Sequence, residues 1–98
     1  SEYVFLEEYY PDKPLSEAEV YELDRNVDRK TKANKKNIFK VFSHLKALRR
    51  YMMDKDVKWY RKSVVVAALI YFITPIDAIG VIAWTIKFLG DEITGYYD

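Results

Sequence analysis

The chain has 98 residues, of which 50% are hydrophobic and 32% are charged, and its formal net charge is +1. This profile predicts one globular domain with a modest core and excludes a disordered chain. Cysteine is absent, which excludes disulfides, thiolate nucleophiles and zinc fingers and is compatible with a reducing cytoplasm.

The small net charge conceals a strong segregation of charge along the chain. Residues 1–24 carry eight acids and one lysine, whereas residues 25–62 carry fourteen lysines or arginines and three acids. Residues 63–98 carry four acids and one lysine. Either the acidic N-terminal segment folds over the basic middle, or the basic middle meets an external anionic surface, and the sequence leaves both interpretations open.

The first elements are an arm and a helix. Residues 1–14 form an arm whose pattern leaves open a short helix or an extended segment. Ser16 followed three residues later by Glu19 is a capping box, which predicts a helix start. The polar residues 28–37 either extend this helix or link it to the next one, with a break near Asn34.

A second helix is expected from Asn37, because apolar residues then recur at intervals of three and four. This stripe consists of Ile38, Val41, Phe42, Leu45, Leu48 and Met52. Asp54 or Asp56 should end this helix and cap a third one over residues 57–73. The third helix is apolar all round from Val64, which predicts a central position in a bundle or contact with lipid. Its apolar run is too short to cross a membrane.

The segment after the third helix reads as the start of a fourth. Thr74 can cap this helix, Pro75 suits its first position, and the Asp77 carboxylate would face its positive end. The chain should therefore bend here and continue as a helix to about Ile93.

Three glycines bear on the fourth helix. Gly80 lies inside it and suggests close packing or another bend, and Gly90 or Gly95 can end it. No alternating strand pattern of useful length is visible. We therefore expect one all-α domain over residues 1–98, a small bundle of about four helices with a helical hairpin around Thr74–Asp77.

One motif in the hairpin suggests a family. The residues that fit are Tyr71, Thr74, Pro75, Asp77 and Ile79, with Asp91 at the second position of an acid pair. On these residues the core segment, residues 57–93, resembles the YkvA-like family, a bacterial group of domains of unknown function. The resemblance implies a small helical bacterial domain, often suspected of membrane association, with no established reaction.

Catalytic chemistry finds little support in the sequence. Asp77, Asp91 and Glu92 could bind a metal or transfer protons, but on a straight helix Asp77 and Asp91 lie too far apart to share an ion, and a helix-capping role is favoured. His44 is the only histidine and points about 100° away from the neighbouring Ser43 on a helix. We expect no catalytic, cofactor-binding or metal-binding residues, no cofactor and no enzymatic activity.

A basic and aromatic set of residues is the candidate site. It consists of Arg49, Arg50, Lys58, Trp59, Arg61 and Lys62. Cations beside interfacial aromatics favour an anionic membrane surface, with Trp84 and Phe88 as a second contact patch. We therefore expect a helical binding or scaffolding module at the cytoplasmic face of a membrane, with an anionic membrane surface or a protein as its partner. The alternative is a soluble module that binds a protein or a nucleic acid through residues 25–62.

Overall fold

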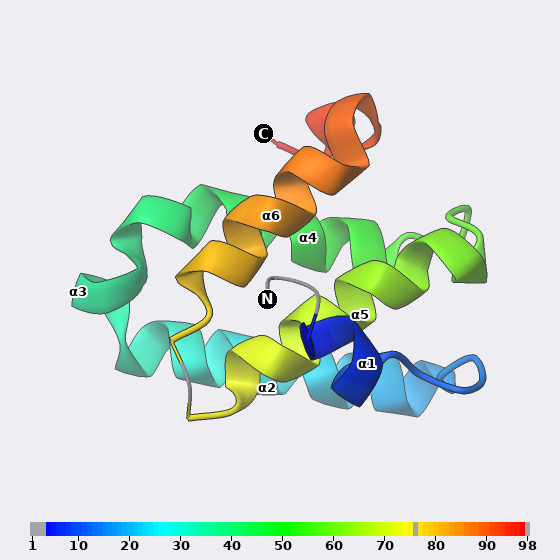
Figure 1. Ribbon diagram of the computed structural model, residues 1–98, viewed down its shortest axis with the longest axis horizontal. Coiled ribbons are helices and arrows are strands. Elements are labelled where there is room, and N and C mark those ends of the chain that lie inside the picture. The colour runs from blue at the N-terminus through cyan, green and yellow to red at the C-terminus, as the bar shows by residue number, and fades with distance from the viewer. Residues whose placement is uncertain (1–3, 76, 98) are drawn as a thin grey trace.

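The structure is a computed structural model that describes residues 4–75 and 77–97, and all regular secondary structure in these ranges is helical (Figure 1). The elements are α1 (Val4–Tyr9), α2 (Glu17–Ala33), α3 (Lys35–Ile38), the 3-10 helix η1 (Phe39–Val41), α4 (Phe42–Met53), α5 (Trp59–Ile73), α6 (Ile79–Leu89) and the 3-10 helix η2 (Gly90–Tyr96). The predicted all-α fold is confirmed, and α2, α4, α5 and α6 are its long helices. Residues 1–3 of the arm, Ile76 of the turn and Asp98 lie outside the described residues.

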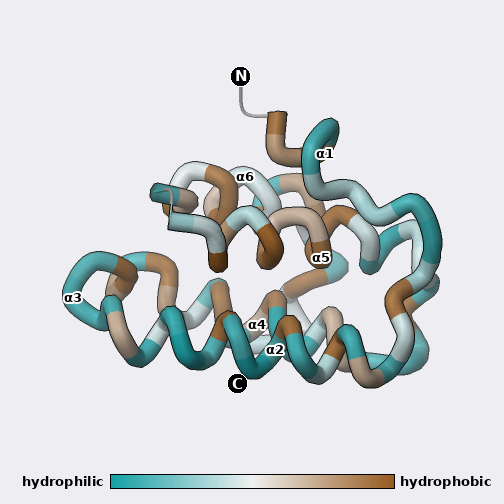
Figure 2. The backbone as a smooth tube through the Cα atoms, turned by 90° about the horizontal axis from the view of Figure 1, so that it is seen from below, coloured by the Kyte–Doolittle hydropathy of each residue, from teal (hydrophilic) through white to brown (hydrophobic). Residues whose placement is uncertain are grey.

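The helices form three layers. Figure 2 shows α1 on one side, α2 and α4 on the opposite side, and α5 and α6 between them. α5 contacts α1, α2, α4 and α6, and its residues 63–69 are all buried. A helix that is covered on every side needs apolar residues on every side. The predicted central position of this helix is therefore confirmed.

Two hydrophobic cores lie on opposite faces of α5. The main core joins α5 and α6 to α2 and α4, and includes Val27, Leu48, Met52, Val66, Leu69 and Ile82. The outer core lies under α1, where Phe5 is 1% exposed and packs on Ala67 and Ala68. The two small alanines let α1 approach α5 closely. The N-terminal arm is thus a short helix over its described residues, one of the two forms that the sequence left open.

The start of α2 follows its local sequence. The amide of Glu19 donates to Ser16 Oγ at 3.2 Å, and the amide of Ser16 donates to Glu19 Oε1 at 2.8 Å. This reciprocal pair is the predicted capping box. α2 then continues to Ala33, and the chain breaks at Asn34 as expected. Most of the polar segment that follows Val27 therefore extends the helix.

The start of α5 differs from the prediction. Asp54 ends α4, as expected, but the residue that precedes α5 is Lys58. Asp54 Oδ1 instead accepts the amide of Asp56 at 2.9 Å within the connecting turn. The prediction that Asp54 or Asp56 caps this helix is wrong, because the turn itself uses the carboxylate.

The turn between α5 and α6 also differs. Thr74 does not begin a helix; its hydroxyl donates to the Tyr71 carbonyl at 2.6 Å and closes α5. The Lys30 ammonium donates to the carbonyls of Phe72 and Thr74. These bonds satisfy carbonyls that would accept backbone amides if the helix continued. The chain therefore continues beyond α5 in an extended conformation.

α6 consequently starts at Ile79, four residues after the predicted first position at Pro75. The Asp77 carboxylate accepts the Ile79 amide at 3.2 Å, so it does face the start of the helix, from outside it. α6 runs back at an angle to α5, and it contacts both α5 and α4 (Figure 1); this is the expected hairpin.

The glycine predictions are confirmed in part. Gly80 is exposed in the first turn of α6, and a Cβ built on it meets no atom of the described residues within 4 Å. The expected close packing at Gly80 is therefore wrong, and Gly80 is the second residue of α6. Gly90 ends α6 with a φ of 57°, a conformation that favours glycine, whereas Gly95 lies within η2.

Candidate anionic-surface binding site

The chain reverses between α2 and α4 through α3 and η1. We call this region, residues 35–46, the basic corner, and it includes the end of the molecule at which α3 lies in Figure 1. Its backbone is held in place because Ile38 and Val41 are buried in the main core. At its entrance the Asn34 side-chain amide donates to the Lys30 carbonyl at 2.9 Å. The corner is thus anchored from the inside, whereas Lys35, Lys36, Phe39, Lys40 and Phe42 are exposed.

Two phenylalanines lie on the outside of the basic corner. Phe39 is 67% exposed and Phe42 is 41% exposed, and both lie outside the two cores that the described residues form. The prediction that Phe42 belongs to the buried stripe is wrong. Neighbouring helical positions point about 100° apart, so only one of Val41 and Phe42 can face the core, and Val41 continues the line to Leu45.

Positive charge surrounds these rings. Lys35, Lys36 and Lys40 are exposed, and residues 29–53 contain nine lysines or arginines and no acid. Phe42, Lys35 and Lys46 line one open cavity of about 240 Å³, which places them side by side. The corner therefore combines exposed apolar rings with a high local density of basic side chains.

The six residues that the sequence singled out do not share one surface. Arg49 lies against α2, where its guanidinium donates to Asp24 Oδ1 at 2.8 Å and to Asp28 Oδ1 at 3.2 Å. The hydrogen bond to Asp24 raises the pKa of Arg49. This pair is one place where the acidic N-terminal segment does fold against the basic middle.

Arg61, near the start of α5, lies against η2. Its guanidinium donates to Glu92, and its Cζ lies 5.3 Å from the centroid of the Phe88 ring. The Tyr51 hydroxyl donates to the second oxygen of the same carboxylate at 2.6 Å. The pKa of Glu92 is lowered, first by the Tyr51 hydroxyl and then by Arg61.

Arg50 and Lys62 make further internal contacts. Arg50 donates to the Tyr96 carbonyl at 3.1 Å, and Lys62 donates to the Asp54 carbonyl at 2.8 Å. Burial lowers the pKa of Lys62, because a charged ammonium is disfavoured where water is excluded. These two cations therefore also contribute to holding the fold together.

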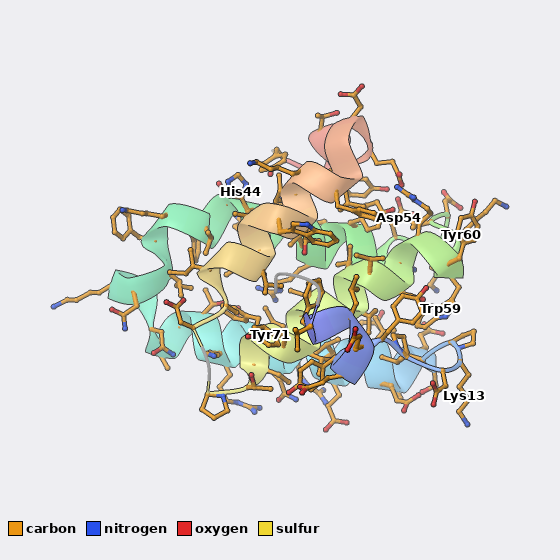
Figure 3. All side chains as sticks on the ribbon, in the orientation of Figure 1. Lys13, His44, Asp54, Trp59, Tyr60 and Tyr71 are labelled. Carbon is orange, nitrogen blue, oxygen red and sulfur yellow. The ribbon has the colours of Figure 1, made fainter. Side chains whose placement is uncertain are left out.

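Lys58 and Trp59 lie at the start of α5. Lys58 is exposed, Trp59 packs partly on the main core, and the next ring along the chain, Tyr60, is 64% exposed. Figure 3 shows Trp59 and Tyr60 at the end of the molecule opposite to α3. Phe39 and Phe42 were not predicted from the sequence as surface residues. Phe39 lies outside the predicted apolar stripe and directly before Lys40, and this position was a signal of its exposure.

The other residues considered for chemistry are spread out. Asp77 precedes α6, whereas Asp91 and Glu92 follow it, so the helix separates them. His44 Nδ1 lies 2.6 Å from the Tyr97 hydroxyl oxygen. Within residues 4–75 and 77–97, no group of three or more His, Cys, Asp or Glu side chains is arranged to hold a metal ion.

The described helices are each too short or too polar to cross a membrane. Comparisons of the chain with protein-family models, with curated proteins and with solved structures give no match. Function therefore has to be inferred from the chemistry of the described residues.

Proposed function

We propose that this protein is a non-enzymatic binding module that docks on an anionic membrane surface through its basic corner. The single observation that carries the proposal is the exposure of Phe39 and Phe42 among lysines. Exposed apolar groups beside cations are the features that bind the surface of a bilayer without crossing it. The resemblance of residues 57–93 to YkvA-like domains, which stays a prediction, leads to the same expectation.

The energies favour a lipid surface as the partner. Fully burying a phenylalanine side chain contributes about 1.5 to 3 kcal/mol. Each lysine close to an anionic membrane adds about 1 kcal/mol. Phe39 is 67% exposed and Phe42 is 41% exposed, so only about half of this burial is still to be gained on docking. Together with Lys35, Lys36 and Lys40 the two rings contribute about 5 to 6 kcal/mol, a sub-millimolar attraction before the entropy lost on docking is subtracted.

The same corner fits a nucleic acid less well. Proteins that bind single strands usually combine stacking rings with a groove that follows the phosphates, whereas Phe39 lies on a one-turn helix at a reversal of the chain. Lysines on flexible stems act as point charges and do not fix the geometry of a phosphate as arginine does. Binding to a nucleic acid or to a protein is therefore an alternative that the following experiment can detect.

The experiment is vesicle flotation with purified protein. Vesicles of phosphatidylcholine alone are compared with vesicles that also contain phosphatidylglycerol, at low and high salt. We expect binding to the anionic vesicles only, weakened by salt. The variant Phe39→Ala with Phe42→Ala should lose most of this binding with little loss of helicity, because both rings lie outside the cores.

Tyr60→Ala is the control, since Tyr60 is 64% exposed, close to the 67% of Phe39, but lies at the other end of the molecule. It should bind as the parent protein does. A second variant, with Lys58, Arg61 and Lys62 replaced by Glu, tests the site that the sequence suggested. If that variant loses binding at full helicity and the phenylalanine variant keeps it, the contact lies at the start of α5. Absence of binding to any vesicle, or retention on RNA or DNA instead, refutes the proposal.

A further inference from the structure

A second site lies at the opposite end of the molecule. A cavity of about 300 Å³ opens between the start of α2, the end of α4 and the start of α5. Its apolar walls include Leu15, Val20, Met53 and Trp59. This volume is at the lower end of the range of about 300 to 1,000 Å³ that is usual for small-molecule sites. The cavity is thus large enough for a single ring system or a short alkyl chain.

Lys62 provides a polar group at this cavity. Lys62 is one of the lining residues, and its ammonium donates to the Asp54 carbonyl at 2.8 Å. An ammonium has three N–H donors, so this bond leaves two for a ligand. The Asp54 carboxylate accepts the Tyr96 hydroxyl and the Asp56 amide. Burial lowers the pKa of Lys62, and the nearby Asp54 charge opposes this and favours the ammonium form.

A second cation lies at the mouth. Lys55 Nζ is 3.4 Å from Glu17 Oε1, and both side chains are largely exposed, at 80% and 68%. An exposed pair of this kind contributes at most about 1 kcal/mol. An incoming anion can therefore replace Glu17 beside Lys55 at little cost.

We infer that this cavity binds a small amphipathic monocarboxylate, with its apolar body against Trp59 and Met53 and its carboxylate on the Lys62 ammonium. A carboxylate is the complement of a partly buried cation that keeps free donors, because a charge-assisted hydrogen bond is stronger than a neutral one. The inference does not depend on the proposed membrane contact, which uses the opposite end of the molecule.

The test uses octanoate below its micellar concentration and its neutral analogue octanamide. The chain has two tryptophans, so a nitrogen–proton correlation spectrum shows two indole signals. The Trp59 signal should shift saturably with octanoate, whereas the signal of Trp84, on α6, should stay in place. Bound octanoate should also raise the melting temperature.

Lys62→Gln keeps a donor for the Asp54 carbonyl and removes the charge, and it should weaken octanoate binding about tenfold. Lys58→Gln is the matched control, since Lys58 is an exposed cation in the same segment that does not line the cavity; it should leave binding unchanged. Val20→Trp should fill the cavity and abolish binding. The inference is overturned if the Trp59 signal does not shift, if octanamide binds as well as octanoate, or if Lys62→Gln has no effect.

Discussion

Glu92 joins three elements through its two carboxylate oxygens. One oxygen accepts the hydroxyl of the fully buried Tyr51 on α4, and the other accepts the guanidinium of Arg61 on α5. The Tyr51 ring also packs against Tyr96, with centroids 5.2 Å apart. The carboxylate on η2 therefore fixes the C-terminal segment to the main core through contacts that depend on its ionisation.

Glu92→Gln should make stability less dependent on pH in the acid range. The pKa of Glu92 is lowered in the folded protein, so its charge stabilises the fold above the unfolded value of about 4.3. That contribution is lost as the pH falls through the folded pKa. At pH 7 the variant should lose at most about 1 kcal/mol of unfolding free energy, since the pair with Arg61 is partly exposed.

Urea unfolding of both proteins at pH 7 and at pH 3 measures this difference. The difference between the two proteins should be smaller at pH 3 than at pH 7, because protonation of the parent carboxylate removes its ionic contribution. Asp91→Asn, one residue away and exposed, is the control and should leave the curves at both pH values nearly unchanged. A difference of equal size at both pH values would contradict the ionic origin of the effect.

At the scale of the elements, the two ends of α6 carry glycines with opposite requirements. Gly80 has ordinary helical surroundings and space for a methyl group, whereas Gly90 has a positive φ of 57°. Gly80→Ala should therefore raise the free energy of unfolding by about 0.5 kcal/mol, mainly by restricting the unfolded chain. Gly90→Ala should lower it by about 1 to 3 kcal/mol, because alanine is strained at this φ.

Thermal and urea unfolding of the two single variants check this pair, and each serves as the other's control. Two changes of the same sign would show that the backbone of one glycine differs from the structure described above.

The elements also show which features a sequence can predict. The capping box at Ser16 involves residues three apart, and it was predicted correctly. The start of α6 was predicted incorrectly, because it depends on Lys30. This residue lies 42 positions before Phe72 and binds the last carbonyls of α5. In the same way the exposure of Phe42 depends on the 3-10 turn before it, and the pairing of Arg49 with Asp24 depends on how α2 packs against α4. Hydrogen bonds between residues close in the sequence could be predicted from their spacing, whereas contacts between distant segments could not.

At the scale of the whole molecule, the three layers separate the proposed sites from one another. The basic corner and the cavity beside Trp59 lie at opposite ends of the long axis (Figure 3). A corner docked on a bilayer therefore leaves the mouth of the cavity open to solvent. Among the described residues, the third surface, the face of α5 and α6 under α1, is covered by a helix of six residues.

This thin third layer leads to a prediction about how the molecule opens. A helix of six residues is not stable alone, so α1 depends on the packing of Phe5. The centroid of the Phe5 ring lies 5.5 Å from that of Trp84 and 6.0 Å from that of Tyr71. Phe5→Ala should lower the free energy of unfolding by about 3 kcal/mol or less, because α1 can detach before the main core unfolds. Val4→Ala, at a position 44% exposed, should change it little.

Hydrogen exchange and limited proteolysis distinguish detachment from general loss of stability. In Phe5→Ala the amides of α1 should exchange freely and the linker, residues 10–16, should be cleaved early. The amides at the centre of α5, around Val66, should keep most of their protection, because the main core does not include α1. Equal loss of protection in α1 and α5 would instead mean that the two cores unfold as one unit, and that α1 is an integral layer of the fold.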